Sequence, residues 1–315
     1  MSNVQKNAAL VVGSVDLQVN GYVGVDFNDP QTTREAILKS ARAMRGHSVA
    51  AALPTIITAA PATMLACIGN LRQAIEADAE VAAVFRGFHV EGPFLSPRPG
   101  FIGAHPVEHA QSQDMTLLSE LLDAGGGLVR LLTLAPELDS LGRMTEFCAQ
   151  RGVLVAAGHT DASLAELECC IAAGLSLFTH LGNGCPRQMD RHDNIIYRAL
   201  RCADHLRFTL IADGFHLPET LFRNLLNWVP LERLAVVSDA ISAAGLGPGT
   251  YQLGPRQVTI GADRAARDPS GEHFVGSAST MPDADRWLAN TLGLSLSQRQ
   301  QLLRDNPAAW LGWSK

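Results

Sequence analysis

The chain has 315 residues, 47% of them hydrophobic, and a formal net charge of −6. This length and composition predict one globular domain over residues 1–315 with a substantial core. No apolar run is long enough to cross a membrane, and the scattered lysines and arginines do not form the basic stripe of a nucleic-acid-binding surface.

Short apolar runs typical of buried strands alternate with helical patterns along most of the chain. The strand-like runs cover residues 9–19, 49–58, 85–92, 128–136, 152–159, 175–180, 206–216 and 233–240. Helical patterns between them include residues 32–47, 61–80, 136–152 and 161–174. A Thr near a Glu opens the first of these helices, Pro opens the second, and Gly ends the last two.

Eight strand–helix units in succession predict an α/β fold of the TIM type, a (β/α)₈ barrel with its strands within about residues 10–240. The alternative is an open doubly wound sheet. We favour the barrel because no glycine-rich dinucleotide-binding loop follows the first strand. A Gly-rich stretch at 241–254, a short hairpin-like excursion at 258–276 and helices over about 281–312 complete the chain.

Four polar side chains stand at the ends of strand-like runs: Glu91, His159, His180 and Asp239. Because active sites of barrels lie at the carboxyl ends of the strands, we expect these residues to converge. One carboxylate and two imidazoles suit one catalytic divalent metal with a position left for water, and Asp239 could handle the proton of that water. We expect zinc, with iron, manganese or cobalt as alternatives.

Each of these residues also has a simpler interpretation. Glu91 could pair with a neighbouring Arg, and either His could be a structural capping partner. The residues after His159, Thr160 and Asp161, have the character of a helix N-cap.

Three further segments carry candidate site residues. His216 follows the seventh strand, a region where barrels often bind phosphate. His105 lies in a Gly-rich loop, and Arg191 lies in a charged loop. A surface or capping role is the alternative for each.

Cysteine usage and the first residues bear on the compartment. None of the six cysteines forms a C-x-x-C pair, which favours reduced thiols over a thiolate zinc site. The first ten residues lack the basic start and long apolar stretch of a secretory signal. We therefore expect a cytoplasmic protein.

Three motifs in order, "HVEGPF" at 89–94, "AGHTDA" at 157–162 and "IADGFH" at 211–216, resemble the N-acetylglucosamine-6-phosphate deacetylase family of the amidohydrolase superfamily. The resemblance covers nearly the whole chain. It implies metal-dependent hydrolysis of the N-acetyl group of an amino sugar, N-acetylglucosamine 6-phosphate, giving glucosamine 6-phosphate and acetate.

The resemblance also implies a role for each matching residue. The metal ligands are Glu91, His159 and His180. Asp239 is the general base and acid, and His105 polarises the acetamido carbonyl. The substrate contacts are Asn183, the backbone of Gly184, Arg191 and His216, the last two at the phosphate. The counterpart of Arg191 in that family reaches the phosphate of a neighbouring subunit, so a homodimer is implied.

Many amidohydrolases carry H-x-H at the end of the first strand and can hold two metals. Gln18 and Asn20 stand there in this chain. Amides are weak ligands for zinc-like ions, so we expect one metal.

The chain departs from the family pattern in three places. It begins at the first strand and ends after the last helix, so we expect a variant without the small β-sandwich of the family. The family's Tyr-Asn-Ala-Met is Gly-Asn-Gly-Cys at 182–185, and its Arg-Glu-Pro-Gly is Arg-His-Asp-Asn at 191–194. These changes keep two alternatives open: an amidohydrolase for an unphosphorylated or different N-acyl substrate, and an inactive barrel that binds sugar phosphates.

Overall fold

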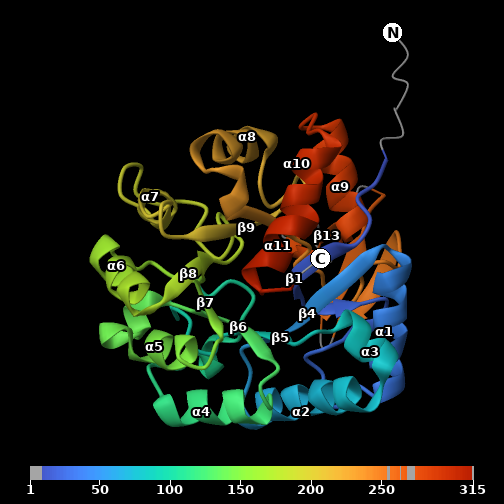
Figure 1. The fold of residues 1–315 in the computed structure, drawn as a ribbon, viewed down its shortest axis with the longest axis horizontal. Helices are drawn as coiled ribbons and strands as arrows, with labels where there is room; N and C mark the ends of the chain where they lie inside the picture. The colour runs from blue at the N-terminus through green and yellow to red at the C-terminus, as the bar shows by residue number, and fades with distance from the viewer. Residues whose placement is uncertain (1–8, 254–255, 263, 268–273, 314–315) are drawn as a thin grey trace.

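The computed structural model describes residues 9–253, 256–262, 264–267 and 274–313. Its centre is a sheet of eight parallel strands whose neighbours follow the order of the chain (Figure 1). These strands are β1 (Ser14–Val19), β4 (Val49–Ile57), β5 (Phe88–Glu91), β6 (Val129–Leu134), β7 (Leu154–Ala157), β8 (Leu175–Phe178), β9 (Arg207–Ile211) and β10 (Leu234–Val237).

The sheet closes between its first and last strands. The amide of Asp239 donates to the carbonyl of Gln18 at 3.0 Å, and the amide of Asn20 donates to the carbonyl of Ala240 at 2.8 Å. A parallel bridge joins Val19 to Ala240. The predicted (β/α)₈ barrel is therefore confirmed, and the open doubly wound sheet is wrong.

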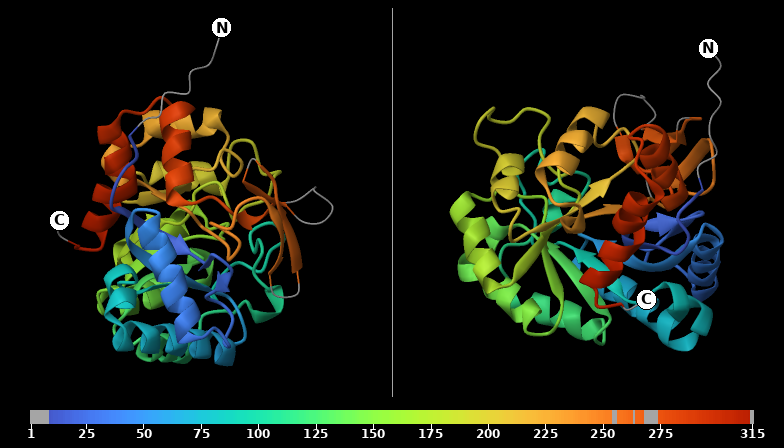
Figure 2. Two further views of the ribbon diagram at one scale, coloured as in Figure 1. Left: turned by 90° about the vertical axis from the view of Figure 1, so that its right-hand side faces the viewer. Right: turned by 45° about the horizontal axis from the view of Figure 1, so that its top comes forward.

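Helices follow the strands and cover the outside of the barrel (Figure 2). They are α1 (Arg34–Gly46), α2 (Pro61–Ala77), α3 (Ala79–Val84), α4 (Met115–Ala124), α5 (Arg143–Ala149), α6 (Leu164–Ala173), α7 (Ile195–Arg201) and α8 (Glu219–Trp228). Short 3-10 turns lie between them: η1 (Val107–His109), η2 (Pro136–Leu138), η3 (Ser140–Gly142) and η4 (Leu231–Arg233). Two short strands, β2 (Gly21–Tyr22) and β3 (Val25–Asp26), form a ribbon after β1.

Local sequence signals explain most helix starts. The side chain of Thr33 accepts a hydrogen bond from the amide of Ala36 at the start of α1, and Pro61 occupies the first turn of α2. The expected cap of α6 is wrong. Ser163, not Thr160 or Asp161, caps this helix, in a capping box with Glu166.

The excursion after β10 is larger than the predicted hairpin. It forms a four-stranded antiparallel sheet of β11 (Gly249–Leu253), β12 (Arg256–Ile260), β13 (Ala265–Arg267) and β14 (Phe274–Ser277). A hydrogen bond from the amide of Ile241 to the carbonyl of Ser277 joins this sheet to the carboxyl end of β10. Val258 and Ile260 are buried in a small hydrophobic core that is separate from that of the barrel. Parts of the predicted hairpin, residues 263 and 268–273, lie outside the described residues.

The C-terminal helices fall where the sequence predicts them. They are α9 (Met281–Asn290), α10 (Leu296–Gln300), the π-helical turn η5 (Gln301–Asp305) and α11 (Asn306–Trp310). Trp310 and Leu311 pack against the apolar barrel interior, which includes Leu17, Leu53 and Leu177. The interior is therefore a packed core covered by the last helix, as in other barrels of this kind.

Two expectations about the whole chain can be compared with the structure. None of the helices in the described part of the chain is both long and apolar enough for a membrane span. All six cysteines are free thiols.

Candidate active site

The residues predicted to converge do so at the carboxyl ends of the strands. Glu91 is the last residue of β5, and His159, His180 and Asp239 each follow their strand by two residues. All four are buried. The two His and Asp239 have left-handed φ angles of +51°, +33° and +46°. Such backbone costs about 1–3 kcal/mol per residue without glycine and is characteristic of functional sites.

The side chains meet around the carboxylate of Glu91. Its Oε1 lies 2.8 Å from Nε2 of His180 and 3.4 Å from Nε2 of His159. Its Oε2 lies 3.7 Å from Nε2 of His105, which the sequence placed in a separate loop. Glu91, His105 and His159 each offer a ligand atom, all within 4.8 Å of one another. Four groups able to bind a cation therefore face one another.

The hydrogen bonds of His159 fit a metal ligand. Its Nδ1 lies 2.8 Å from the carbonyl oxygen of Phe101, which can only accept, so Nδ1 carries the proton. In the neutral ring, Nε2 is then a lone pair that faces a carboxylate oxygen. Two acceptors in this arrangement need a cation between them, and this pairing of ring nitrogens is typical of metal-binding histidines.

His105 has the opposite tautomer. Its Nδ1 receives the backbone amide of Thr58 at 3.3 Å and lies 3.0 Å from the hydroxyl of the same residue. Nε2 therefore carries the proton of the neutral ring and is a donor. Burial lowers the pKa of His105 to about 3, and the neighbouring His159 adds to this shift, so the ring is neutral.

Burial and close pairing set the protonation of the other groups. Burial opposes ionisation of Glu91, but its contacts with His159 and His180 outweigh burial and hold the pKa of Glu91 well below its ordinary range. Burial alone would lower the pKa of His180, and the contact with Glu91 raises it instead. Burial raises the pKa of Asp239, and the charge of Glu91 adds to this shift while His180 opposes it. A carboxyl group with a raised pKa is suited to exchange protons.

Two side-chain amides, one in β1 and one directly after it, support the carboxylates. Gln18 Nε2 donates to Glu91 Oε2 at 3.0 Å, and Asn20 Nδ2 donates to Asp239 Oδ1 at 2.7 Å. The buried atoms Gln18 Oε1 and His180 Nδ1 have no hydrogen-bond partner among the described residues. Buried polar atoms without a protein partner are typical of sites that a ligand or water completes.

His216 forms a partly buried pair with Asp213. Its Nδ1 lies 2.6 Å from Asp213 Oδ2. Burial alone would lower the pKa of His216, but Asp213 raises it, and the ring tends toward the cationic form. A cation beside the site is compatible with an anionic ligand.

The loop after His180 holds the remaining predicted residues. Asn183 is half-buried, and its amide donates to the carbonyl of His180 at 2.8 Å. A Cβ on Gly184 would lie 2.9 Å from Nδ1 of His159, so this buried backbone lies directly against the site. Arg191 is exposed and makes no hydrogen bond or ion pair within the described part of the chain. The structure does not bring Arg191 into the cluster.

The sequence did not reveal several supporting groups. Thr58 orients His105, and the carbonyl of Phe101 orients His159. Their contacts arise from backbone atoms and a neighbouring strand, and they leave no pattern in the sequence. The sequence does offer a signal for Asp213, because it lies three residues before His216 in the motif "ADGFH".

The barrel and the carboxylate–histidine cluster at its strand ends define a metal-dependent amidohydrolase. A curated relative, the N-acetylglucosamine-6-phosphate deacetylase of Homo sapiens, is 30% identical over 97% of this chain and 75% of its own length. The chain belongs to the N-acetylglucosamine-6-phosphate deacetylase family. No family model matches the chain.

Two further relatives bear on the ligand. The N-acetylgalactosamine-6-phosphate deacetylase of Shewanella sp. is 31% identical over 97% of this chain and 75% of its own length. The structure of a mutant N-acetyl-D-glucosamine-6-phosphate deacetylase from Mycobacterium smegmatis, in complex with N-acetyl-D-glucosamine-6-phosphate, has a TM-score of 0.85. It is 29% identical, and the match covers 96% of this chain and 78% of that chain.

Proposed function

We propose that this protein hydrolyses the N-acetyl amide of N-acetylglucosamine 6-phosphate to give glucosamine 6-phosphate and acetate. The convergence of Glu91, His159 and His180 beside Asp239 carries this proposal, since family membership alone does not guarantee a working site. The close contact among these buried groups argues against the alternative of an inactive barrel. The kinetic comparison described below tests the other alternative, an unphosphorylated or different N-acyl substrate.

Glu91, His159 and His180 would hold one divalent ion, zinc or, alternatively, iron, manganese or cobalt. When bound, such an ion supplies Lewis-acid chemistry and lowers the pKa of water toward neutrality. The side-chain amide of Gln18 holds Glu91 in place through its hydrogen bond to Oε2. We assign His180 rather than His105 as the third ligand. Thr58 donates to Nδ1 of His105 and so leaves the proton of that ring on Nε2, whereas Nδ1 of His180 has no hydrogen-bond partner among the described residues and can carry the proton of its ring.

Asp239 would accept the proton of the attacking water and return it to the leaving nitrogen. The amide of Asn20 holds its Oδ1, which leaves Oδ2 for the transferred proton. His105 Nε2 would donate a hydrogen bond to the acetamido carbonyl as negative charge develops on its oxygen. Asn183 and the backbone of Gly184 would contact the sugar.

His216 and Arg191 would bind the 6-phosphate, since the arginine is positively charged and Asp213 favours the charged form of the His216 ring. In the proposed homodimer, Arg191 would contact the phosphate of the substrate bound to the partner subunit. This assignment rests on the family resemblance and on the exposure of Arg191. We propose a cytoplasmic location from the same resemblance and from the six free thiols.

Steady-state hydrolysis of three compounds tests the proposal: N-acetylglucosamine 6-phosphate, N-acetylgalactosamine 6-phosphate and N-acetylglucosamine. We expect the first to have the highest kcat/KM. The galactosamine compound is included because a relative of similar identity is named for it. Asp239→Asn should retain the metal and lose roughly 10²-fold or more in kcat, the usual size of acid–base effects.

Acetate release must depend on a stoichiometric divalent ion. A metal-loaded protein that releases no acetate from any of the three compounds would show that the proposal is wrong. Near-normal turnover by Asp239→Asn would remove this residue from the mechanism.

A further inference from the structure

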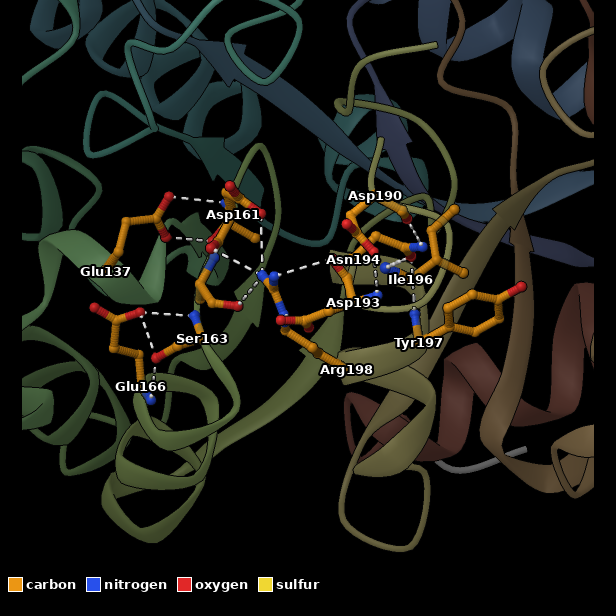
Figure 3. A network of polar contacts seen from close by, with 12 residues as sticks. Glu137, Asp161, Ser163, Glu166, Asp190, Asp193, Asn194, Ile196, Tyr197 and Arg198 are labelled. Atoms are coloured by element: carbon orange, nitrogen blue, oxygen red, sulfur yellow. Dashed lines mark hydrogen bonds and ion pairs between the residues drawn. The ribbon is translucent and has the colours of Figure 1, made fainter. Parts of the chain in front are cut away.

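A network of ion pairs joins three loops that surround the site. Figure 3 shows the part of this network around Asp161 and Arg198. The first loop, residues 92–106, holds His105. The second follows His159, and the third, residues 181–194, holds Arg191.

Arg198, in α7, joins the second and third loops. Its Nη1 donates to Oδ1 of Asp161 at 3.0 Å and to the carbonyls of Asp161 and Ala162 at 3.2 and 3.1 Å. On the other side, its Nε donates to Oδ1 of Asp193 at 2.6 Å and its Nη2 to the carbonyl of Asp193 at 3.3 Å. The guanidinium thus bridges two loops through five acceptors, a role that its rigid fork allows and a lysine cannot reproduce.

The segment beside Asp193 is a tight turn. Oδ1 of Asp190 accepts hydrogen bonds from the amides of His192 and Asp193 at 2.8 and 2.9 Å. Nδ2 of Asn194 donates to the carbonyl of Asp190 at 2.9 Å. Arg191 lies inside this turn with an exposed side chain. The backbone that carries Arg191 is therefore ordered by its own turn and by Arg198.

Asp161 also connects the network to the first loop. It forms an ion pair with Arg98, and its amide donates to Oε1 of Glu137 at 2.9 Å. Asp161 stands two residues after His159, so the network is anchored to the rim of the site.

We propose that Arg198 is a positioning residue for substrate binding, which holds the 190–193 turn so that Arg191 points its charge at the substrate phosphate. This inference rests on the proposed function and deepens it. Arg198 itself touches no substrate, because its guanidinium is committed to Asp161, Ala162 and Asp193.

A double-mutant cycle between Arg191 and Arg198 tests the inference. Arg191→Ala should raise KM for N-acetylglucosamine 6-phosphate about tenfold, the effect of losing one charge-assisted hydrogen bond. Arg198→Met should raise the same KM by a similar factor and leave kcat within about twofold, with KM for unphosphorylated N-acetylglucosamine unchanged. In the Arg191→Ala background, Arg198→Met should have no further effect, because it acts through the missing side chain.

Matched variants separate positioning from general structure. Arg223 in α8 also bridges separate segments, since it donates to the carboxylate of Glu219 and to the carbonyls of Thr291 and Leu292. Arg223→Met should therefore leave KM unchanged. Arg198→Lys should recover little of the affinity. Asp193→Asn provides a second route if Arg198→Met does not fold, because the Asp193 side chain is 75% exposed and its loss spares the core.

The outcomes distinguish the inference from the function on which it rests. If Arg191→Ala leaves KM unchanged, the phosphate role of Arg191 is wrong and the inference falls with it. If Arg191→Ala raises KM but Arg198→Met and Asp193→Asn do not, the function stands and the inference is wrong. Effects of Arg191→Ala and Arg198→Met that multiply in the double variant would also overturn it.

Discussion

Individual ring nitrogens decide which histidines can bind a metal. His105 and His159 both lie beside Glu91, and their positions alone do not distinguish them. Their hydrogen bonds do: a carbonyl accepts from Nδ1 of His159, whereas an amide donates to Nδ1 of His105. The second arrangement leaves His105 as a donor, which suits stabilisation of a developing oxyanion better than metal ligation.

This difference predicts separate losses in two variants. His159→Phe should lose more than about 100-fold in metal affinity, since even loss of a group that only orients a ligand costs about 10–100-fold. His105→Phe should keep a stoichiometric metal and lose kcat. Elemental analysis after dialysis against graded chelator, together with steady-state rates, measures both effects. Loss of the metal from His105→Phe to the same degree would place His105 among the ligands and our assignment of it as a donor would be wrong.

The residues of the site differ in how well the sequence predicts them. Glu91, His159, His180 and Asp239 were predictable because each ends an apolar run, and parallel strands bring such ends together. The groups that fix their protonation were not predictable. The amide of Thr58 approaches His105 across a loop, and a backbone amide has no signature in the sequence.

At the level of elements, the strands were predictable and the caps less so. All eight barrel strands fall inside predicted runs, because buried parallel strands are continuously apolar. Strand β11 was missed because it lies in a Gly-rich stretch with weak strand character. The predicted cap of α6 is wrong because Thr160 and Asp161 resemble cap residues but bind Glu137 instead. Its carboxylate accepts hydrogen bonds from the hydroxyl of Thr160 and the amide of Asp161.

The true cap of α6 gives a stability prediction. The hydroxyl of Ser163 accepts a hydrogen bond from the amide of Glu166, and the carboxylate of Glu166 accepts one from the amide of Ser163 at 2.7 Å. Ser163→Ala removes the cap and should lower the free energy of unfolding by about 1 kcal/mol, measured by urea denaturation. Ser119→Ala, within α4, is the control and should not destabilise the protein, because Ala is the better helix former. Equal stability of Ser163→Ala and the unaltered protein would contradict the cap.

At the scale of the whole molecule, the two ends of the described chain meet over one buried ion pair. Arg299 in α10 pairs with Asp285 in α9, and both side chains are 3% exposed. The amide of Val11 donates to Oδ2 of Asp285 at 2.6 Å, and Arg299 Nη2 donates to the carbonyl of Ala9 at 3.1 Å. The segment that leads into β1 is therefore fixed by the helices that follow the small sheet (Figure 1).

Breaking this pair should cost more than replacing it. Asp285→Ala leaves a buried guanidinium without its partner and should lower the free energy of unfolding by about 3–5 kcal/mol. The double variant Asp285→Leu with Arg299→Met removes both charges and should lose less than Asp285→Ala alone, because no unpaired charge stays buried. Urea denaturation measures each variant, and Arg42→Met, in the exposed pair with Glu80, is the control that should match the unaltered protein. A double variant as unstable as Asp285→Ala, or more so, would contradict the predicted cost of an unpaired buried charge.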